Sequence, residues 1–237
     1  MSQLEDIVVS YRILAEFGII DAYGHVSVRS EANRDRYLIA RSLAPELVTA
    51  DDIIEYDLES NALHDTRQPV SERFIHGEVY RLRSDVNAVV HNHSPTVVPF
   101  SVTQRPLRPI FHMAAFIGLG VPVFEIRDVE RGTDMLVKTP KLGQALASAL
   151  GDKPAALMRG HGAVVVGENI QRAVGRSVYL EMSARMQLQA MTIAGPEGGI
   201  AYLDEAEVRA ANSVQDYARA WPMWREKVLR RLAEGGI

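Results

Sequence analysis

The sequence predicts an α/β layered domain, and three features of the chain support this prediction. Segments with a helical apolar period alternate irregularly with short apolar segments of strand length. Hydrophobic residues make up 47% of the 237 residues, which is enough to bury one sizeable core. No repeat, low-complexity tract or clear internal boundary interrupts this pattern. We therefore expect residues 1–237 to form a single domain.

The N-terminal third is expected to hold one helix, three strands and the start of a second helix. Apolar residues recur with a helical period from Leu4 to Ala15, and the period ends near Gly18. Ser71 is expected to cap a helix that runs to about Arg83. The three strands are expected at residues 25–29, 36–40 and 53–57.

The rest of the chain continues the alternation of strands and helices. Strands are expected at residues 87–93, 121–126, 155–159 and 163–167. Helices are expected at residues 96–102, 133–150, 169–193 and about 204–233. A Gly-His-Gly turn at residues 160–162 separates the last two strands.

Charge and composition exclude several classes of protein and of site. The formal net charge is −4 and no block of five or more like charges occurs, which argues against nucleic-acid binding but allows a small anionic substrate. The chain contains no cysteine, so a metal would have to be held by histidine and carboxylate. Neither a signal peptide nor an apolar segment long enough for a bilayer is visible, so we expect a cytoplasmic protein that does not enter a membrane.

Two histidines, His91 and His93, lie at the end of an apolar strand segment. Side chains two residues apart on a strand share a face, so both imidazoles point the same way and Asn92 points the opposite way. Such a pair can bind one cation, but it is equally compatible with polar residues at the end of a strand.

A third histidine and a glutamate are candidates for the same site. His161 lies between two glycines, which let the backbone approach a ligand closely. With His91 and His93 it would complete three neutral nitrogen ligands, the set that leaves a position open for substrate. Glu72 is either a carboxylate that caps a helix, a general base, or a displaceable fourth ligand. Spacing alone leaves the roles of His161 and Glu72 open.

In combination, Glu72, the His-Asn-His motif and the Gly-His-Gly motif resemble the class II aldolase/adducin family. The resemblance extends from about Leu4 to Met191 and includes GHVSVR (24–29), SERFIHGEVYR (71–81), DVNAVVHNHSP (85–95), PIFHMAAF (109–116) and RGHGAVVVG (159–167). It implies a three-layer α/β/α sandwich around a mixed, largely antiparallel sheet, assembled as a homotetramer with active sites at subunit interfaces. It also implies that His91, His93 and His161 are the metal ligands and that Glu72 is the catalytic acid/base.

The departures from the sugar-phosphate aldolases of this family concern the substrate. Their Gly-Asn pair is replaced by Gly24-His25, and their small-residue phosphate loop is replaced by residues 40–43, Ala-Arg-Ser-Leu. A phosphate cradle needs small residues and exposed N–H groups, so Leu43 argues against a phosphorylated substrate. The tyrosine that follows His112 in related aldolases is Met113 here, and the acidic residue of related epimerases is missing.

These departures favour a metal-dependent decarboxylase of an ortho-hydroxy aromatic or pyridine (di)carboxylate, a reaction of some family members in aromatic catabolism. A cation held by three neutral imidazoles keeps its charge and stabilises the enolate or phenolate that forms as CO₂ leaves. Glu72 would then deliver the proton. Imidazole ligands suit Mn²⁺ or Zn²⁺, and also Fe²⁺ or Co²⁺. The expected substrate contacts are His25, Arg41, Ser42, Ser71 and, from the neighbouring subunit, His112.

Three alternatives remain open from the sequence: an aldolase acting on a non-phosphorylated hydroxy-keto acid, an Fe(II) oxygenase, and an adducin-like binding module without the metal. Retention of the three histidines and Glu72 argues against the last of these. C-terminal tyrosines of relatives reach an adjacent site, and Tyr202 and Tyr217 are the candidates here. His76, one helical turn after Glu72, is interpreted as a supporting or packing residue.

Overall fold

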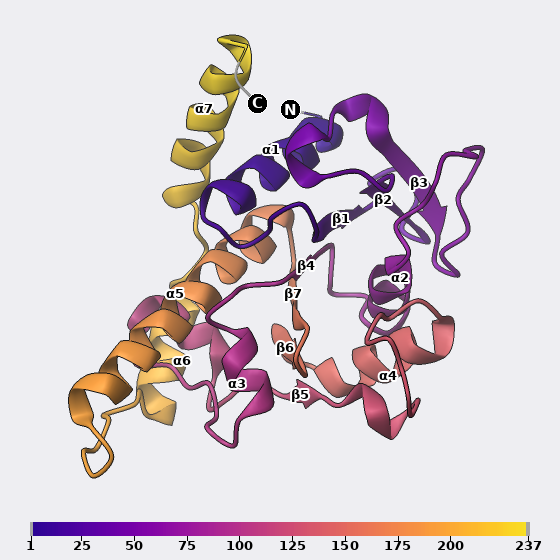
Figure 1. Ribbon diagram of the computed structural model, residues 1–237. Coiled ribbons are helices and arrows are strands. Elements are labelled where there is room, and N and C mark those ends of the chain that lie inside the picture. The colour runs from indigo at the N-terminus through magenta and orange to yellow at the C-terminus, as the bar shows by residue number, and fades with distance from the viewer. Residues whose placement is uncertain (1, 236–237) are drawn as a thin grey trace.

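The computed structural model describes residues 2–235 and contains a seven-stranded sheet with helices on both faces (Figure 1). Neighbouring strands are antiparallel except for β5 and β6, which are parallel. The sheet is therefore mixed and largely antiparallel, as the family resemblance implied. In the order in which they pair, the strands are β3 (Ile53–Asp57), β2 (Arg36–Ala40), β1 (His25–Arg29), β4 (Ala88–Asn92), β7 (Gly162–Gly167), β6 (Ala155–Met158) and β5 (Val123–Phe124).

Helices on the two faces of the sheet enclose two hydrophobic clusters. Helices α1 and α5 pack against one face, and α2 and α4 pack together against the other (Figure 1). The α-helices are α1 (Gln3–Glu16), α2 (Arg73–Leu82), α3 (Val98–Val102), α4 (Pro140–Leu150), α5 (Ile170–Ala194), α6 (Glu205–Ser213) and α7 (Ala220–Ala233). Short 3₁₀ helices lie at Pro45–Leu47, Ala50–Asp52, His112–Ile117 and Ile126–Asp128. No helix within residues 2–235 is long and apolar enough to cross a membrane.

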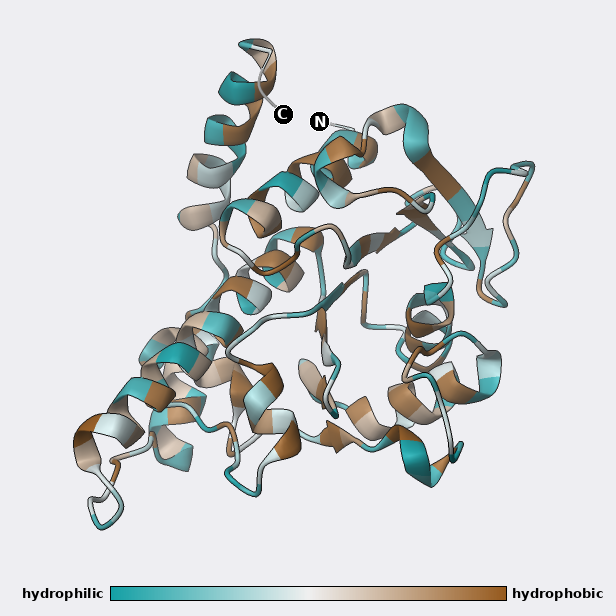
Figure 2. Cartoon of the chain, viewed as in Figure 1, coloured by the Kyte–Doolittle hydropathy of each residue, from teal (hydrophilic) through white to brown (hydrophobic). Residues whose placement is uncertain are grey.

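Alternation along the central strand β4 supplies both clusters. Ala88 and Val90 belong to the cluster under α1 and α5, whereas Val89 belongs to the cluster under α2 and α4. This follows from the period of two along a strand, which sends successive side chains to opposite faces. Hydrophobic and hydrophilic residues are interleaved along the surrounding helices, as expected for helices that bury one side (Figure 2). The prediction of an α/β layered architecture is confirmed.

The predicted helix at 133–150 begins only at Pro140. Thr139 is its N-cap, because its side chain accepts a hydrogen bond from the Leu142 amide, and Pro140 occupies the first turn. Upstream, Met135 has a positive φ of 72°, which a helix cannot contain. Residues 133–139 are therefore an irregular segment, and its backbone contributes to the site described below.

Two other predicted elements are shorter than expected. The strand predicted at 121–126 is reduced to Val123–Phe124. The helical region predicted at 204–233 is interrupted between α6 and α7, where Tyr217 has a positive φ of 58°. The Tyr217 ring occupies the space in which a side chain at Gly175 of α5 would lie, and it stacks on Tyr179 with ring centroids 5.5 Å apart. Packing of this buried ring against α5 accounts for the break.

Candidate metal centre

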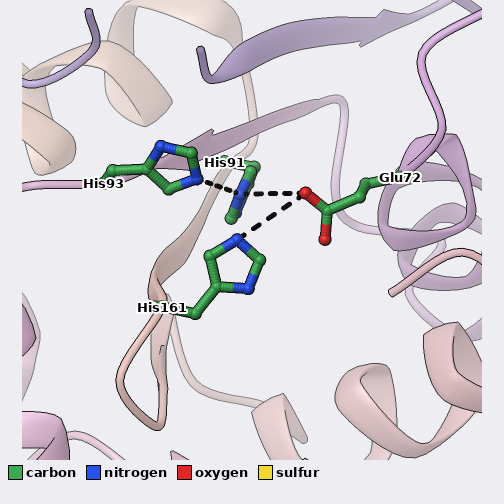
Figure 3. Close-up of side chains that lie close together, drawn as sticks. All are labelled: Glu72, His91, His93 and His161. Atoms are coloured by element: carbon green, nitrogen blue, oxygen red, sulfur yellow. Dashed lines mark hydrogen bonds and ion pairs between the residues drawn. The ribbon is translucent and has the colours of Figure 1, made fainter. Parts of the chain in front are cut away.

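Four side chains from three separate parts of the sheet and its helices converge on one point (Figure 3). Each of Glu72, His91, His93 and His161 offers one ligand atom, and these atoms all lie within 4.8 Å of one another. Figure 3 shows the three imidazoles gathered on one side and the Glu72 carboxylate directed at them from α2. The four residues that the sequence and the resemblance singled out are thus brought together.

The end of β4 positions the first two histidines. His91 is fully buried in the strand, and His93 follows directly after it. Their Nε2 atoms are 3.2 Å apart, which confirms that side chains at i and i+2 share a face here. The Nδ1 of His91 lies 3.2 Å from the Ala163 carbonyl of the adjacent strand β7, which accepts its proton and leaves the Nε2 lone pair directed at the cluster.

The turn between β6 and β7 positions His161, and both of its glycines have a structural reason. Gly160 has a positive φ of 63°, and a Cβ on Gly162 would lie 2.0 Å from the Asn92 carbonyl oxygen. The turn can therefore lie directly against β4 only because both flanking residues are glycine. The Nδ1 of His161 donates to the Met135 carbonyl at 3.0 Å, so this imidazole also directs its Nε2 lone pair inward.

Glu72, not Ser71, is the N-cap residue of α2, and neither side chain caps the helix. Instead, Glu72 Oε1 accepts a hydrogen bond from the Val137 amide at 2.8 Å. Its Oε2 lies 3.6 Å from His91 Nε2 and 3.7 Å from His161 Nε2. The prediction that Ser71 caps this helix was wrong, because the N-cap is one residue later, at Glu72. The Glu72 carboxylate points into the site and does not cap the helix.

Burial sets the protonation of the site. It raises the pKa of Glu72, and the neighbouring His161 and the Val137 amide only partly offset that rise. It lowers the pKa of His91 well below the usual value and also lowers the pKa of His93, and the other imidazoles add to both shifts. His91 and His93 are thus held neutral, with lone pairs available, and burial shifts Glu72 toward its protonated form.

The donor set fits a divalent cation. Two nitrogens held about 2.0–2.1 Å from one tetrahedral ion lie roughly 3.3 Å apart, close to the observed separation of the His91 and His93 Nε2 atoms. Backbone carbonyls hold the outer nitrogens of His91 and His161, which is the usual support of metal-binding histidines. Three imidazoles and a carboxylate without thiolate suit Mn²⁺, Fe²⁺, Co²⁺ and Zn²⁺ alike.

A pocket of about 450 Å³ opens beside this cluster. Of the predicted substrate contacts, His25, Ser42 and Ser71 line it together with Glu72 and His93. Arg41 does not line it; its Nε donates to the Asp52 carboxylate at 2.7 Å. His112 is exposed at the start of a 3₁₀ helix and is not among the residues that line this pocket.

Sequence reasoning missed other residues around the pocket. Tyr23 and Leu136 line it, and neither carried a recognisable signal in the sequence. His76 is fully buried and does more than pack, since its Nε2 lies 2.6 Å from His25 Nδ1. The signal that links these two histidines is the one-turn spacing from Glu72, which places His76 behind the site. Tyr217 is buried within its own chain, and Tyr202 contacts Gln187 and Arg108.

Comparisons with known proteins agree with this geometry. The sequence profile of the Class II Aldolase and Adducin N-terminal domain matches residues 5–188. The decarboxylase tropJ of Talaromyces stipitatus is 33% identical over 248 aligned residues, covering 95% of this chain and 92% of that protein. The 3,4-dihydroxyphthalate decarboxylase of Arthrobacter keyseri is 30% identical, covering 92% of this chain and 90% of that protein.

The fold is also that of solved members of the family. The structure of an L-fuculose 1-phosphate aldolase from Glaciozyma antarctica PI12 superposes with a TM-score of 0.78 at 24% identity, covering 98% of this chain and 90% of the other. At that identity the likeness supports the fold alone. The profile match and the two sequence relatives carry the assignment further. The chain belongs to the class II aldolase and adducin family, and it is a carbon–carbon lyase like the decarboxylases and aldolases among its relatives.

Proposed function

We propose that this protein is a metal-dependent decarboxylase of an ortho-hydroxy aromatic or pyridine (di)carboxylate. The observation that carries the proposal is the buried Glu72 carboxyl, which faces His91, His93 and His161 beside the pocket. Its relatives include decarboxylases that align with nine-tenths of the chain, one of them acting on a dihydroxyphthalate. Their substrate class is the one for which this site is suited.

The metal would be held by His91, His93 and His161, with Glu72 beside them. When bound, it supplies a Lewis acid that stabilises negative charge developing on substrate oxygens next to the leaving carboxylate. His91 and His93 contribute by staying neutral, because burial lowers the pKa of both. Neutral ligands leave the full charge of the cation available to the substrate.

Glu72 supplies the proton that completes the reaction. In the step we assign to it, the bond between the ring carbon and the carboxylate carbon breaks, CO₂ leaves, and the electron pair stays on the ring. The proton of the Glu72 carboxylic acid then moves to that carbon, and solvent returns a proton to the carboxylate afterwards. Burial favours the acid form before the step, and the Val137 amide holds the oxygen that stays unprotonated.

The part of the pocket formed by residues 42–44 fits a carboxylate better than a phosphate. Leu43 and Ala44 line it beside the Ser42 side chain, so bulk and apolar surface occupy the place of a phosphate cradle. Ser42 and His25 offer polar groups to a substrate carboxylate or hydroxyl. Arg41 precedes this segment and supplies positive charge, although its Nε is engaged by Asp52. Direct contact of Arg41, Ser71 and His112 with substrate remains part of the proposal.

The proposal is tested by measuring CO₂ release from a panel of hydroxy-aromatic and hydroxypyridine dicarboxylates with added Mn²⁺ or Zn²⁺. We expect turnover on at least one member of the panel and none after treatment with a chelator. Release of pyruvate from a hydroxy-keto acid, with no CO₂ from any panel member, would instead identify an aldolase. Dependence on O₂ would identify an oxygenase, and a protein that binds none of these metals would be a binding module.

We also propose that the protein is a homotetramer in which His112 serves the pocket of a neighbouring subunit. His112 is exposed and is not one of the residues that line its own chain's pocket, so it is available to a second copy. Large apolar side chains at Val102, Leu119 and Val123 are also exposed. Sedimentation equilibrium measures the assembly directly, and a monomer at micromolar concentration would refute this part of the proposal.

A further inference from the structure

A chain of hydrogen bonds runs from the pocket into the core between β1 and α2. His25 Nδ1 lies 2.6 Å from His76 Nε2, and His76 Nδ1 lies 2.6 Å from Ser27 Oγ. Ser27 Oγ in turn lies 2.8 Å from the Tyr80 hydroxyl. All four residues are buried, and only His25, at the outer end, lines the pocket. The chain therefore connects one pocket side chain to three residues that the substrate cannot reach.

Burial lowers the pKa of His76 to about 3, so this imidazole is neutral and only one of its two nitrogens carries a proton. The proton between His76 Nε2 and His25 Nδ1 therefore belongs to one ring or to the other. In a neutral imidazole one nitrogen donates and the other accepts. Along a chain of such groups, the protons are donated either toward the pocket or toward the core. The two directions place the proton of His25 on opposite nitrogens of its ring.

The inner end of the chain selects one direction. Burial raises the pKa of Tyr80, so the phenol keeps its proton, and Ser27 Oγ is the hydrogen-bond partner of its hydroxyl among the described residues. Ser27 Oγ is thus the acceptor available to the Tyr80 proton. If the chain ran the other way, Ser27 would donate to Tyr80 and the phenol proton would be stranded in the core. A buried donor without an acceptor is disfavoured, so Tyr80 donates to Ser27.

The remaining protons follow from that first bond. Ser27 donates to His76 Nδ1, His76 Nε2 donates to His25 Nδ1, and the proton of His25 lies on Nε2. No described residue hydrogen-bonds that Nε2, and it is not among the buried polar atoms without a partner. It therefore presents a free N–H to the pocket.

We infer that Ser27, His76 and Tyr80 are positioning residues that hold His25 as a fixed hydrogen-bond donor to an anionic oxygen of the substrate. The inference rests on the proposed function, since it names the substrate group that His25 recognises. A carboxylate or phenolate oxygen accepts this bond more strongly than a neutral hydroxyl oxygen does, and a cation, which has no lone pair, cannot accept it.

The metal-facing histidines show the opposite arrangement, which strengthens the inference. His91 and His161 donate from Nδ1 to backbone carbonyls and so direct lone pairs at the cluster. The His25 ring lies only 4.9 Å from the His91 ring, yet its Nδ1 accepts a bond and its outward nitrogen carries a proton. The group that bonds Nδ1 of each imidazole thus decides whether its Nε2 offers a lone pair to a metal or an N–H to the substrate.

The test is the ¹⁵N shift of each His25 ring nitrogen in the zinc-loaded protein, assigned by comparison with His25→Gln. We expect a protonated, pyrrole-type Nε2 and an unprotonated, pyridine-type Nδ1. In Ser27→Ala the bias is removed, so both nitrogens should move toward averaged shifts, whereas Ser27→Thr, which keeps a hydroxyl, should restore the wild-type pattern. Ser177→Ala is the matched control, because that buried hydroxyl bonds only within its own helix.

A protonated Nδ1 in the wild-type protein would overturn the inference, and so would unchanged His25 shifts in Ser27→Ala. If Ser27→Ala fails to fold, the wild-type pattern and Ser27→Thr still decide the point. Equal population of the two tautomers halves the competent fraction, so kcat/KM of Ser27→Ala should fall about twofold. The shifts do not depend on turnover. Absence of CO₂ release alongside a protonated Nε2 would therefore refute the proposed function and leave the fixed donor established.

Discussion

Two groups of side chains beside the pocket, which we call the metal wall and the substrate wall, differ in how firmly they are held. The metal wall consists of Glu72, His91, His93 and His161, and backbone groups of Val137, Ala163 and Met135 bind three of its four side chains. The substrate wall consists of His25 and residues 42–44, of which Ser42 is exposed, and the partly exposed Arg41 directly precedes residues 42–44 in the chain. Only His25 on this wall is backed by a buried hydrogen-bond chain.

This difference teaches which part of the site can change without loss of the fold. A side chain fixed by backbone hydrogen bonds is tied to the strand and turn that supply them, so its replacement disturbs both. Exposed side chains on a short connection can be exchanged at little cost to stability. Under the proposed function, the metal wall would carry the reaction and the substrate wall would carry the choice of substrate.

The largest effect is expected for Glu72→Gln on the metal wall. The amide cannot deliver a proton, so kcat for decarboxylation should fall about 10²–10⁴-fold. Gln keeps an oxygen that can accept the Val137 N–H bond, so metal content should stay near that of the wild type. Steady-state kinetics and elemental analysis of the purified variant measure the two quantities.

The matched control for this change is Glu78→Gln. Glu78 is equally buried on the same helix but is paired with Arg81, away from the histidines. It should leave kcat unchanged. Loss of metal from Glu72→Gln would show that Glu72 is a ligand, and would contradict its role as an acid.

Gly162→Ala is expected to have the next largest effect, because it breaks the contact between the two parts of the metal wall. The new methyl carbon would lie 2.0 Å from the Asn92 carbonyl oxygen, so β4 and the turn must separate. We expect a loss of about 1–3 kcal/mol in the free energy of unfolding. Metal affinity, measured by competition with a chelator, should fall at least tenfold because His161 moves away from His91. Gly199→Ala, with no atom within 4 Å of the added carbon, should change neither.

The metal wall was only partly predictable from the sequence. The spacing of His91 and His93 was sufficient to place them on one face, since strand geometry is local. Glu72 and His161 are 89 residues apart, and no local rule brings them together, so the family resemblance supplied that pairing. The sheet order, which puts β7 beside β4, is what makes the turn reach the strand end.

The irregular segment at 133–139 shows why the backbone partners of His161 and Glu72 were not predictable. Its apolar residues at Leu136 and Val137 fit a helical pattern, but the Met135 carbonyl and the Val137 amide bond to His161 and Glu72. A backbone that serves side chains of the site cannot form helical hydrogen bonds at the same groups. The Thr139-Pro140 pair is a signal for the start of a helix, but the apolar period upstream led to an earlier predicted start. The partners of His25 and Arg41 likewise depend on tertiary packing.

Next to the substrate wall, Arg41→Gln is expected to raise KM about tenfold and leave kcat nearly unchanged if Arg41 contacts the substrate as proposed. A hydrogen bond to a charged group contributes about 1.5–3 kcal/mol, and about 1.4 kcal/mol corresponds to tenfold in binding. Asp52→Asn is the control, because it removes the ion pair but leaves the charge of Arg41 in place. If both variants lose stability equally and KM is unchanged in both, Arg41 serves only to hold the strand end.

The smallest effect is expected at the outer edge of the metal wall, where Glu125 pairs with Arg127 and Arg159 just before the Gly-His-Gly turn. Arg127 and Arg159 lower the pKa of Glu125 to about 2 from a usual value of 4.5. Because the folded-state pKa is the lower one, the stabilisation is present above about pH 4.5 and is lost as the pH falls toward 2.

Glu125→Gln should therefore reduce the free energy of unfolding at pH 7 by less than about 1 kcal/mol, since these side chains are partly exposed. The difference from wild type should shrink as the pH is lowered from 4.5 to 3, and urea unfolding at each pH measures it. Glu59→Gln, at an exposed position outside every ion pair described for residues 2–235, should show no such pH dependence. A difference that does not shrink between pH 4.5 and pH 3 would contradict the lowered pKa of Glu125. A tenfold loss of metal affinity in Glu125→Gln would mean that side-chain pairs as well as backbone groups fix the metal wall.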